Sequence, residues 1–237
     1  MRLAVISDVH GNSLALEAVL ADIRAEGADA VVCLGDNVSG PLDPAGAADL
    51  LVGLGCPSVT GNHDRWIFGE DPDAIDRFAL ARLSPTHRQW LADLPATRVL
   101  DGEVFLCHGT PASDEELWLD SYYFDRKTRV PGEADVAAHA AGLDFPVLLC
   151  GHTHIARSVR LKDGRLIVNP GSVGLQFVLG SPDARYALID RRNGGWSVSL
   201  RTVPYDAAAA ADQAVRNGYP RWREVLMYGW ASPEGLF

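Results

Sequence analysis

Two histidines stand one residue apart in the sequence GHTH at residues 151–154, directly after the apolar run 145–150. If this segment is extended, alternate side chains point to the same side, so His152 and His154 point the same way. Two imidazoles on one side of a short turn can each bind one of two neighbouring metal ions. H-x-H also occurs by chance, so a metal site needs further ligands elsewhere in the chain.

Further metal-competent residues follow four earlier apolar runs, at points where a short glycine-containing turn begins. They are Asp8 and His10 in SDVHGN, Asp36 in LGDNV, Asn62, His63 and Asp64 in TGNHDR, and His108 in CHGTP. Because ligands of open α/β sheets bind outside the carboxyl ends of the strands, we expect these turns to converge on one rim.

The converging turns supply carboxylate, amide and imidazole groups as potential metal ligands, with His63 as a further polar group. The predicted ligands are Asp8, His10, Asp36, Asn62, His108, His152 and His154. Such a mixed set can hold two divalent ions, and it suits Mn, Fe, Zn, Co or Ni better than Ca or Mg.

Each of these residues alone has a simpler explanation. Asp8 or Asp36 can cap a helix or stabilise a turn, and Asn62 after a glycine is a common turn residue. A single histidine at a strand end, such as His108, more often satisfies a hydrogen bond than binds a metal. The ordered set of turns, rather than any one residue, therefore indicates the metal site.

The elements that position these turns alternate in the first half of the chain. Apolar runs predict strands at 2–7, 30–35 and 57–61, and helical patterns cover 13–27, 43–55, about 72–83 and about 85–94. Strands that alternate with helices predict β-α-β units and a largely parallel sheet.

The second half of the chain has a different character. The pairs Asp101-Gly102 and Asp163-Gly164, and the triplet at 193–195, each stand between two strand-like runs. Such turns predict antiparallel hairpins. We therefore expect an α/β protein with mixed sheets covered by helices. The chain contains no fixed-period repeat, low-complexity run or linker, so residues 1–237 are predicted to form a single domain.

Two segments extend beyond this pattern, an irregular insertion at about 111–131 and a C-terminal extension at about 205–237 with a helix at 206–217. The insertion contains Trp118, Tyr122, Tyr123, Phe124, Arg126, Lys127 and Arg129. These side chains are candidates for a lid or a base-stacking wall. Packing within the insertion or against a second copy of the chain is the simpler explanation.

Composition narrows the classes of partner. A net charge of −10 disfavours long nucleic acids. Screening over about 8 Å leaves a small anionic substrate open. The N-terminus does not resemble a signal peptide, and no apolar run is long enough to span a membrane. The cysteines, Cys33, Cys56, Cys107 and Cys150, form no C-x-x-C pair and are expected to be reduced thiols of a cytoplasmic protein. A homo-oligomer is left open.

The ordered motifs D-x-H, G-D, G-N-H-D, H-G and G-H-T-H, which span Asp8 to His154, resemble those of the calcineurin-like metallophosphoesterases. The sequence NPGSVG at 169–174 is similar to the small bacterial phosphodiesterase branch of that superfamily. The resemblance implies a four-layer α/β/β/α sandwich with a site for two metal ions at its rim.

The resemblance also implies roles for individual residues. One ion would be held by Asp8, His10, Asp36 and His154, and the other by Asp36, Asn62, His108 and His152, with Asp36 bridging both. His63 would be the catalytic histidine and Asp64 its orienting partner. Phosphoprotein phosphatases of the superfamily carry an arginine in G-D-x-V-D-R-G, whereas this chain has GDNVSGP, which argues against that class.

The expected function is hydrolysis of a small phosphodiester by in-line attack of a hydroxide held between two transition-metal ions, manganese among them. Two divalent ions outweigh the two carboxylates of the site, so it would attract a phosphate ester despite the acidic chain. The alternatives are a phosphomonoesterase that uses the same site, a nuclease or amidohydrolase on a similar site, and a non-catalytic protein-interaction scaffold.

Overall fold

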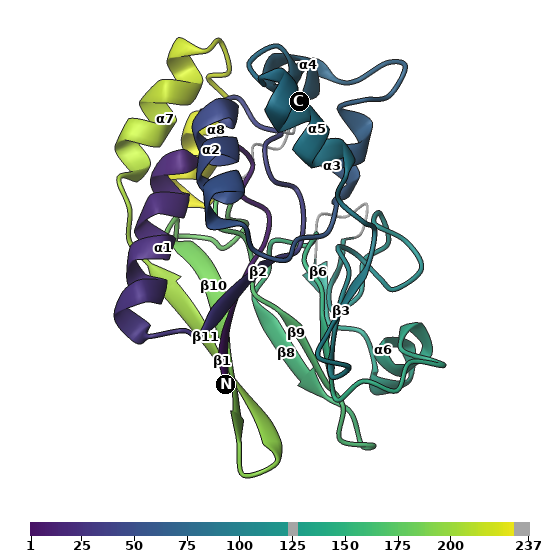
Figure 1. Ribbon diagram of the computed structural model, residues 1–237. Helices are drawn as coiled ribbons and strands as arrows, with labels where there is room; N and C mark the ends of the chain where they lie inside the picture. The colour runs from purple at the N-terminus through teal and green to yellow at the C-terminus, as the bar shows by residue number, and fades with distance from the viewer. Residues whose placement is uncertain (123–127, 230–237) are drawn as a thin grey trace.

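The computed structural model describes residues 1–122 and 128–229 and contains two mixed β-sheets with helices on their outer faces (Figure 1). The first sheet has the order β11-β10-β1-β2, and the second has the order β3-β4-β7-β9-β8. This architecture confirms the predicted four-layer sandwich with mixed sheets.

The first sheet consists of β1 (Arg2–Ile6), β2 (Ala30–Cys33), β10 (Ala184–Arg192) and β11 (Gly195–Val203). Strand β1 runs parallel to β2 and antiparallel to β10. Residues 57–61, predicted as a third strand, contribute only an isolated bridge between Cys33 and Ser58. The segment still delivers the turn at Gly61 to the end of β2.

The second sheet consists of β3 (Arg98–Leu100), β4 (Val104–Leu106), β7 (Val147–Leu149), β8 (Arg157–Arg160) and β9 (Leu166–Asn169). Its three central strands, β4, β7 and β9, are parallel, and the edge strands β3 and β8 are antiparallel to their neighbours. The central strands therefore end at one edge.

The three predicted hairpins are confirmed. They join β3 to β4, β8 to β9 and β10 to β11. Positive φ angles at Asp101 (49°), Gly102 (69°), Asn193 (51°) and Gly194 (76°) are those of tight hairpin turns, which Asp-Gly and Asn-Gly pairs adopt readily.

The helices are α1 (Ser13–Glu26), α2 (Pro44–Leu54), α3 (Asn62–Trp66), α4 (Ala74–Leu80), α5 (Pro85–Ala92), α6 (Glu133–His139), α7 (Ala207–Arg216) and α8 (Trp222–Tyr228). Helix α1 is capped at its start by Asn12, whose side chain accepts a hydrogen bond from the Ala15 amide, and at its end by Gly27, which has a φ of 68°. The helix predicted over about 72–83 is shorter, because Asp73 caps it and it ends at Leu80.

Alternation along β1 explains the layers. Ala4 and Ile6 pack against Leu16 and Val19 of α1, whereas Leu3 and Val5 face the second sheet. The outer face of the second sheet is covered by α6, through residues such as Val136. Each sheet thus buries both faces, and its strand ends are left free to carry polar turns.

The insertion contains a short hairpin of β5 (Ser121–Tyr122) and β6 (Thr128–Arg129), so it is less irregular than predicted. Trp118 is 3% exposed, and its indole donates a hydrogen bond to the Val136 carbonyl, so it is a core residue and not part of a lid. The predictions for Tyr123, Phe124, Arg126 and Lys127 lie outside the described residues.

The predicted C-terminal helix is present as α7, and α8 follows it. The two helices bury Trp222 against Leu42, Ile75 and Leu175, which belong to loops and helices around the site. Helices α7 and α8 therefore pack on the body of the protein, beside α1 and α2 (Figure 1). In the described ranges, no helix has the length and apolar composition that crossing a membrane requires.

Candidate metal centre

The turns after β1, β2, β4 and β7 and the first residue of α3 bring the predicted ligands together at one end of the sheets. His152 is half-buried, and the other ligand side chains are buried. The buried ligands are Asp8, His10, Asp36, Asn62, His108 and His154. Asp8, His10, Asp36, His152 and His154 all have positive φ, between 48° and 68°. Left-handed backbone at non-glycine residues is costly, and such residues cluster at functional sites.

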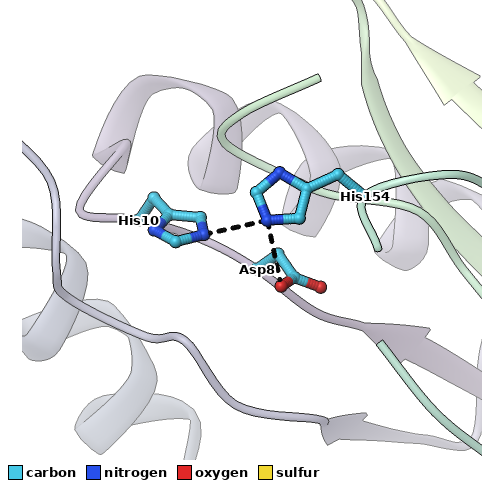
Figure 2. Close-up of side chains that lie close together, drawn as sticks. All are labelled: Asp8, His10 and His154. Atoms are coloured by element: carbon cyan, nitrogen blue, oxygen red, sulfur yellow. Dashed lines mark hydrogen bonds and ion pairs between the residues drawn. The ribbon is translucent and has the colours of Figure 1, made fainter. Parts of the chain in front are cut away.

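The first ligand group consists of Asp8, His10 and His154 (Figure 2). Nε2 of His154 lies 3.3 Å from Oδ1 of Asp8 and 3.2 Å from Nε2 of His10. Nδ1 of His10 donates to the Ser39 carbonyl at 2.7 Å, and Nδ1 of His154 donates to the Leu175 carbonyl at 2.5 Å. These bonds direct Nε2 of both rings toward each other and into the site, where one cation can be bound by both nitrogens.

The second ligand group consists of Asp36, His108 and His152. Nε2 of His108 lies 3.4 Å from Oδ2 of Asp36 and 3.1 Å from Oδ1 of Asn62. Nδ1 of His108 donates to the Leu34 carbonyl at 2.7 Å, so this ring also directs Nε2 into the site. Asn62 adds its amide oxygen to the group.

Asp36 lies between the two groups. Its Oδ2 is 3.7 Å from Nε2 of His10 and 3.4 Å from Nε2 of His108. Its Oδ1 accepts a hydrogen bond from the His63 amide at 3.0 Å, which fixes the orientation of the carboxylate. This is the placement that a bridging ligand requires.

Burial and neighbouring charges move the pKa values of the ligand residues in different directions. Burial lowers the pKa of His10 to about 4, with a contribution from the charge of His154, and burial also lowers the pKa of His152. Burial raises the pKa of Asp8, but the neighbouring charge of His154 lowers that pKa to about 2. Burial lowers the pKa of His108, but the charge of Asp36 and its hydrogen bond raise it to about 10. His10 and His152 are therefore neutral near neutral pH, whereas metal binding at His108 would release a proton.

A buried oxygen gives an independent test of whether these residues fit a metal. Among the described residues, Oδ1 of Asp8 is one of the few buried side-chain oxygens without a hydrogen bond, although the residue is 0% exposed. An ionised oxygen buried without a donor is costly unless a cation compensates it. The donor set and this oxygen together fit a metal ion.

His63 lies at the edge of the ligand groups and is held by an acid that the sequence motifs do not contain. Its Nδ1 is 3.2 Å from Oδ1 of Asp76, a residue of α4 that is 1% exposed. The Ser39 hydroxyl contacts both the His63 ring and the Asp76 carboxylate. Burial lowers the pKa of His63, but the charge of Asp36 and the hydrogen bond to Asp76 raise it to about 9.

The predicted orienting role of Asp64 is corrected by this geometry. Oδ1 of Asp64 accepts from the Asn37 amide at 2.9 Å, and Oδ2 accepts from the Asn37 side chain at 2.7 Å and the Gly61 amide at 3.0 Å. Asp64 therefore caps α3 and ties it to the turn after β2. Asp64 follows His63 directly in the helix, so its side chain leaves in a different direction.

Sequence reasoning missed Asp76, Ser39 and Glu115. Asp76 lies in a helix without a motif, and its burial next to His63 depends on the tertiary fold. Ser39 lies in GDNVSGP, and a serine in a turn of this kind does not by itself signal a functional role. Glu115 contributes through its backbone carbonyl, which accepts from Nε2 of His152 at 3.0 Å, and no residue type signals that.

A cavity of about 160 Å³ opens onto the ligand groups and is bounded on one side by Leu175 and Phe177. The Phe177 ring stacks on His154, with ring centres 4.6 Å apart and planes 6° apart. The described residues that line the cavity include neither lysine nor arginine. They are His10, Asp36, Asn62, His63, His152, His154, Leu175 and Phe177.

Comparison with known proteins identifies the class. Residues 1–194 match the model of the calcineurin-like phosphoesterase superfamily domain, and the chain belongs to this family. The family binds two metal ions, and the described residues contain groups that can hold them.

Individual relatives match nearly the whole chain. An uncharacterized protein of Methanocaldococcus jannaschii is 29% identical over 245 residues, which cover 93% of this chain and 94% of that protein. The crystal structure of a metallophosphoesterase from Sphaerobacter thermophilus has a TM-score of 0.79 and 28% identity, covering 97% of this chain and 100% of that one. A hypothetical protein from Pyrococcus horikoshii shares the fold, with a TM-score of 0.80 and 20% identity over 98% and 99% of the two chains.

Proposed function

We propose that this protein hydrolyses a small phosphodiester with two divalent transition-metal ions bound at the described centre. The observation that carries the proposal is a pair of ligand groups sharing one carboxylate, beside a buried histidine that contacts an acid. We assign Asp8, His10, Asp36 and His154 to one ion, and Asp36, Asn62, His108 and His152 to the other.

When bound, the metal ions would supply an activated water and neutralise charge on the phosphate. The chain's own contribution is the proton for the leaving oxygen, which we assign to Nε2 of His63. Nδ1 of this ring faces Asp76, so the opposite nitrogen is directed away from the acid. A pKa raised to about 9 keeps the ring protonated near neutral pH, as a general acid requires.

The diester preference rests on the cavity next to the ligands. A monoester carries nearly one more negative charge than a diester and gains more from additional cations. Among the described residues, the cavity wall offers Leu175 and Phe177 instead of lysine or arginine. An uncharged ester group can pack on these two apolar side chains, and on that side of the cavity a second phosphate charge would meet no cationic side chain.

Three other sequence predictions stay predictions and belong to this proposal. Residues 1–237 act as one domain, the protein is cytoplasmic, and manganese is among its native metals. Each of the four cysteines is a free thiol, which is compatible with a reducing compartment.

The proposal is tested by hydrolysis of bis-p-nitrophenyl phosphate and p-nitrophenyl phosphate by metal-stripped protein resupplied with Mn, Ni, Co, Zn or Mg in turn. We expect metal-dependent turnover with a higher kcat/KM for the diester. A higher kcat/KM for the monoester would overturn the diester assignment. Failure to bind any metal would contradict the enzyme assignment and favour the scaffold alternative.

A further inference from the structure

We propose that Arg65 positions the metal ligand His152 by anchoring residues 113–116 of the insertion, an inference that rests on the proposed metal centre. Arg65 follows the general acid His63 in α3, whereas His152 lies in the turn after β7. The contact between them runs through Glu115. The insertion thus acts as a positioning element for one metal ligand.

His152 differs from the other ligand histidines in the nitrogen it presents. His10, His108 and His154 each donate Nδ1 to a backbone carbonyl and direct Nε2 into the site. His152 instead donates Nε2 to the Glu115 carbonyl at 3.0 Å, so its Nδ1 is left for the metal. A hydrogen bond on one imidazole nitrogen selects the tautomer and fixes the ring, and metal affinity depends on it.

The carbonyl that selects this tautomer belongs to a loop folded back on the turn after β4. The Thr110 amide donates to the Ser113 carbonyl at 2.7 Å, and the Glu115 amide donates to the Ser113 hydroxyl at 3.2 Å. A Cβ at Gly109 would lie 2.6 Å from the Ser113 carbonyl oxygen, so only glycine allows this close approach. These local contacts fix the base of the loop but do not by themselves hold Glu115 over the metal centre.

Arg65 supplies that hold with a forked contact. Its Nε and NH2 donate to the two oxygens of Asp114, both at 2.9 Å, and NH2 also donates to Oε1 of Glu115 at 2.6 Å. The Trp66 indole donates to the same Glu115 oxygen at 3.3 Å, and the Trp66 ring packs on His63 with centres 5.0 Å apart. Two-point arginine–carboxylate contacts fix geometry more strictly than a single ion pair.

The same contacts argue against a substrate role for Arg65. Its guanidinium is shared between Asp114 and Glu115, so the local sum of charges is negative although an arginine is present. A phosphate approaching this side would meet that negative sum. Arg65 is therefore a positioning residue, and its removal should act through the metal.

The test compares Arg65→Met with Arg191→Met in the full chain. Arg191, a residue of β10, is a matched control because its side chain is 47% exposed, against 50% for Arg65. Like Arg65 it forms an ion pair, with Glu103 at 2.7 Å. Metal-stripped proteins are titrated with Co²⁺, followed by calorimetry and visible absorption. We expect two ions in wild type and R191M, and a second ion bound about 10- to 100-fold more weakly in R65M, the usual loss for an outer-shell change.

A second readout reports on the tautomer directly. In zinc-loaded protein with ¹⁵N-labelled histidine, NMR should show His152 protonated at Nε2 and metal-bound at Nδ1 in wild type. R65M should lose this pattern at His152 while His10 and His154 keep theirs. Wild-type affinity for both ions together with an unchanged His152 spectrum in R65M would overturn the proposal.

A conservative variant keeps the test decisive if R65M folds poorly. Arg65→Lys retains the charge but cannot form the fork, so we expect a smaller loss in affinity for the second ion. Wild-type cobalt affinity in R65K would contradict the need for a forked contact. If wild type itself binds fewer than two ions, the proposed metal centre fails, whereas two ions in wild type and no change in R65M overturn only the role of Arg65.

Discussion

At the residue scale, His63 is the group that separates catalysis from metal binding. It contacts Asp76 through Nδ1 and belongs to neither metal-ligand group described above. We expect His63→Ala to keep both metal ions and to lower kcat by about 10²- to 10⁴-fold, the usual contribution of general acid catalysis.

The loss in His63→Ala should be smallest for nitrophenyl esters, because a good leaving group needs little protonation. His87→Ala is a suitable control, since that ring pairs with Asp49 on α2 and lies outside the ligand groups. Loss of metal in the His63 variant would instead make His63 a ligand. Equal losses for good and poor leaving groups would contradict its role as a general acid.

The contact between Asp76 and His63 predicts a change in pH dependence. Asp76 raises the pKa of His63, and the ring acts in its protonated form, so activity is present below this pKa and is lost as pH rises through it. Asp76→Asn removes the negative charge and lowers the pKa. The alkaline limb of kcat/KM against pH should therefore move to lower pH, and an unchanged limb would show that Asp76 does not act on His63.

The site residues that the sequence did reveal are those whose type alone signals chemistry. Histidine and aspartate after apolar runs indicate metal binding whatever the details of packing. Asp76 could not be inferred in this way, because its burial beside His63 depends on how α4 packs in the folded protein. The orienting role of Asp64 rests on its place in the family motif, and backbone capping explains that position instead.

At the element scale, the turns that deliver the ligands depend on close backbone approach. A Cβ at Gly151 would lie 2.8 Å from Oδ2 of Asp8 and would also collide with the Ser7 hydroxyl. We expect Gly151→Ala to displace Asp8, to weaken metal binding and to lower the midpoint of thermal unfolding.

Gly53→Ala provides the control for that variant. Gly53 is an exposed residue of α2, and a Cβ there meets no atom within 4 Å. Alanine is favoured over glycine in helices by about 0.5–1 kcal/mol, so this variant should be slightly more stable with unchanged metal binding. A Gly151→Ala protein that behaves like Gly53→Ala would show that the tight turn is not required.

The hairpins were the elements most accessible to prediction, because Asp-Gly and Asn-Gly pairs carry their own backbone preference. The segment 57–61 shows the limit of that approach. Its apolar residues predict a strand, yet it forms one bridge to β2 and then turns into α3 at Asn62. Pairing depends on neighbours distant in sequence, which local patterns do not report.

At the scale of the whole molecule, α8 tests whether the C-terminal extension belongs to the same domain as the metal centre. Trp222 is 0% exposed and packs with Leu42, Ile75 and Leu175. Trp222→Ala should destabilise the protein by about 3–5 kcal/mol, the cost of truncating a buried aromatic residue. Thermal unfolding should stay a single transition, and a separate early transition would indicate that the extension is an independent unit.

The layered fold was predictable because each level of the sequence agrees with it. Strand and helix patterns alternate in the first half, hairpins dominate the second half, and the motifs resemble one family. The insertion was less predictable. Trp118 stands in a segment rich in charged residues, which is typical of a surface, yet it is buried and its indole donates a hydrogen bond to the Val136 carbonyl of α6. Residue type alone does not distinguish such a core position from a binding surface.

The most direct test of the central claim is anomalous X-ray diffraction from crystals loaded with Mn²⁺. Two peaks are expected, one among Asp8, His10 and His154 and one among Asp36, His108 and His152, about 3.5–4 Å apart, as in other two-metal sites. A different result, with no peak at these groups or a single peak among His63, Asp73 and Asp76, would contradict the proposed metal centre.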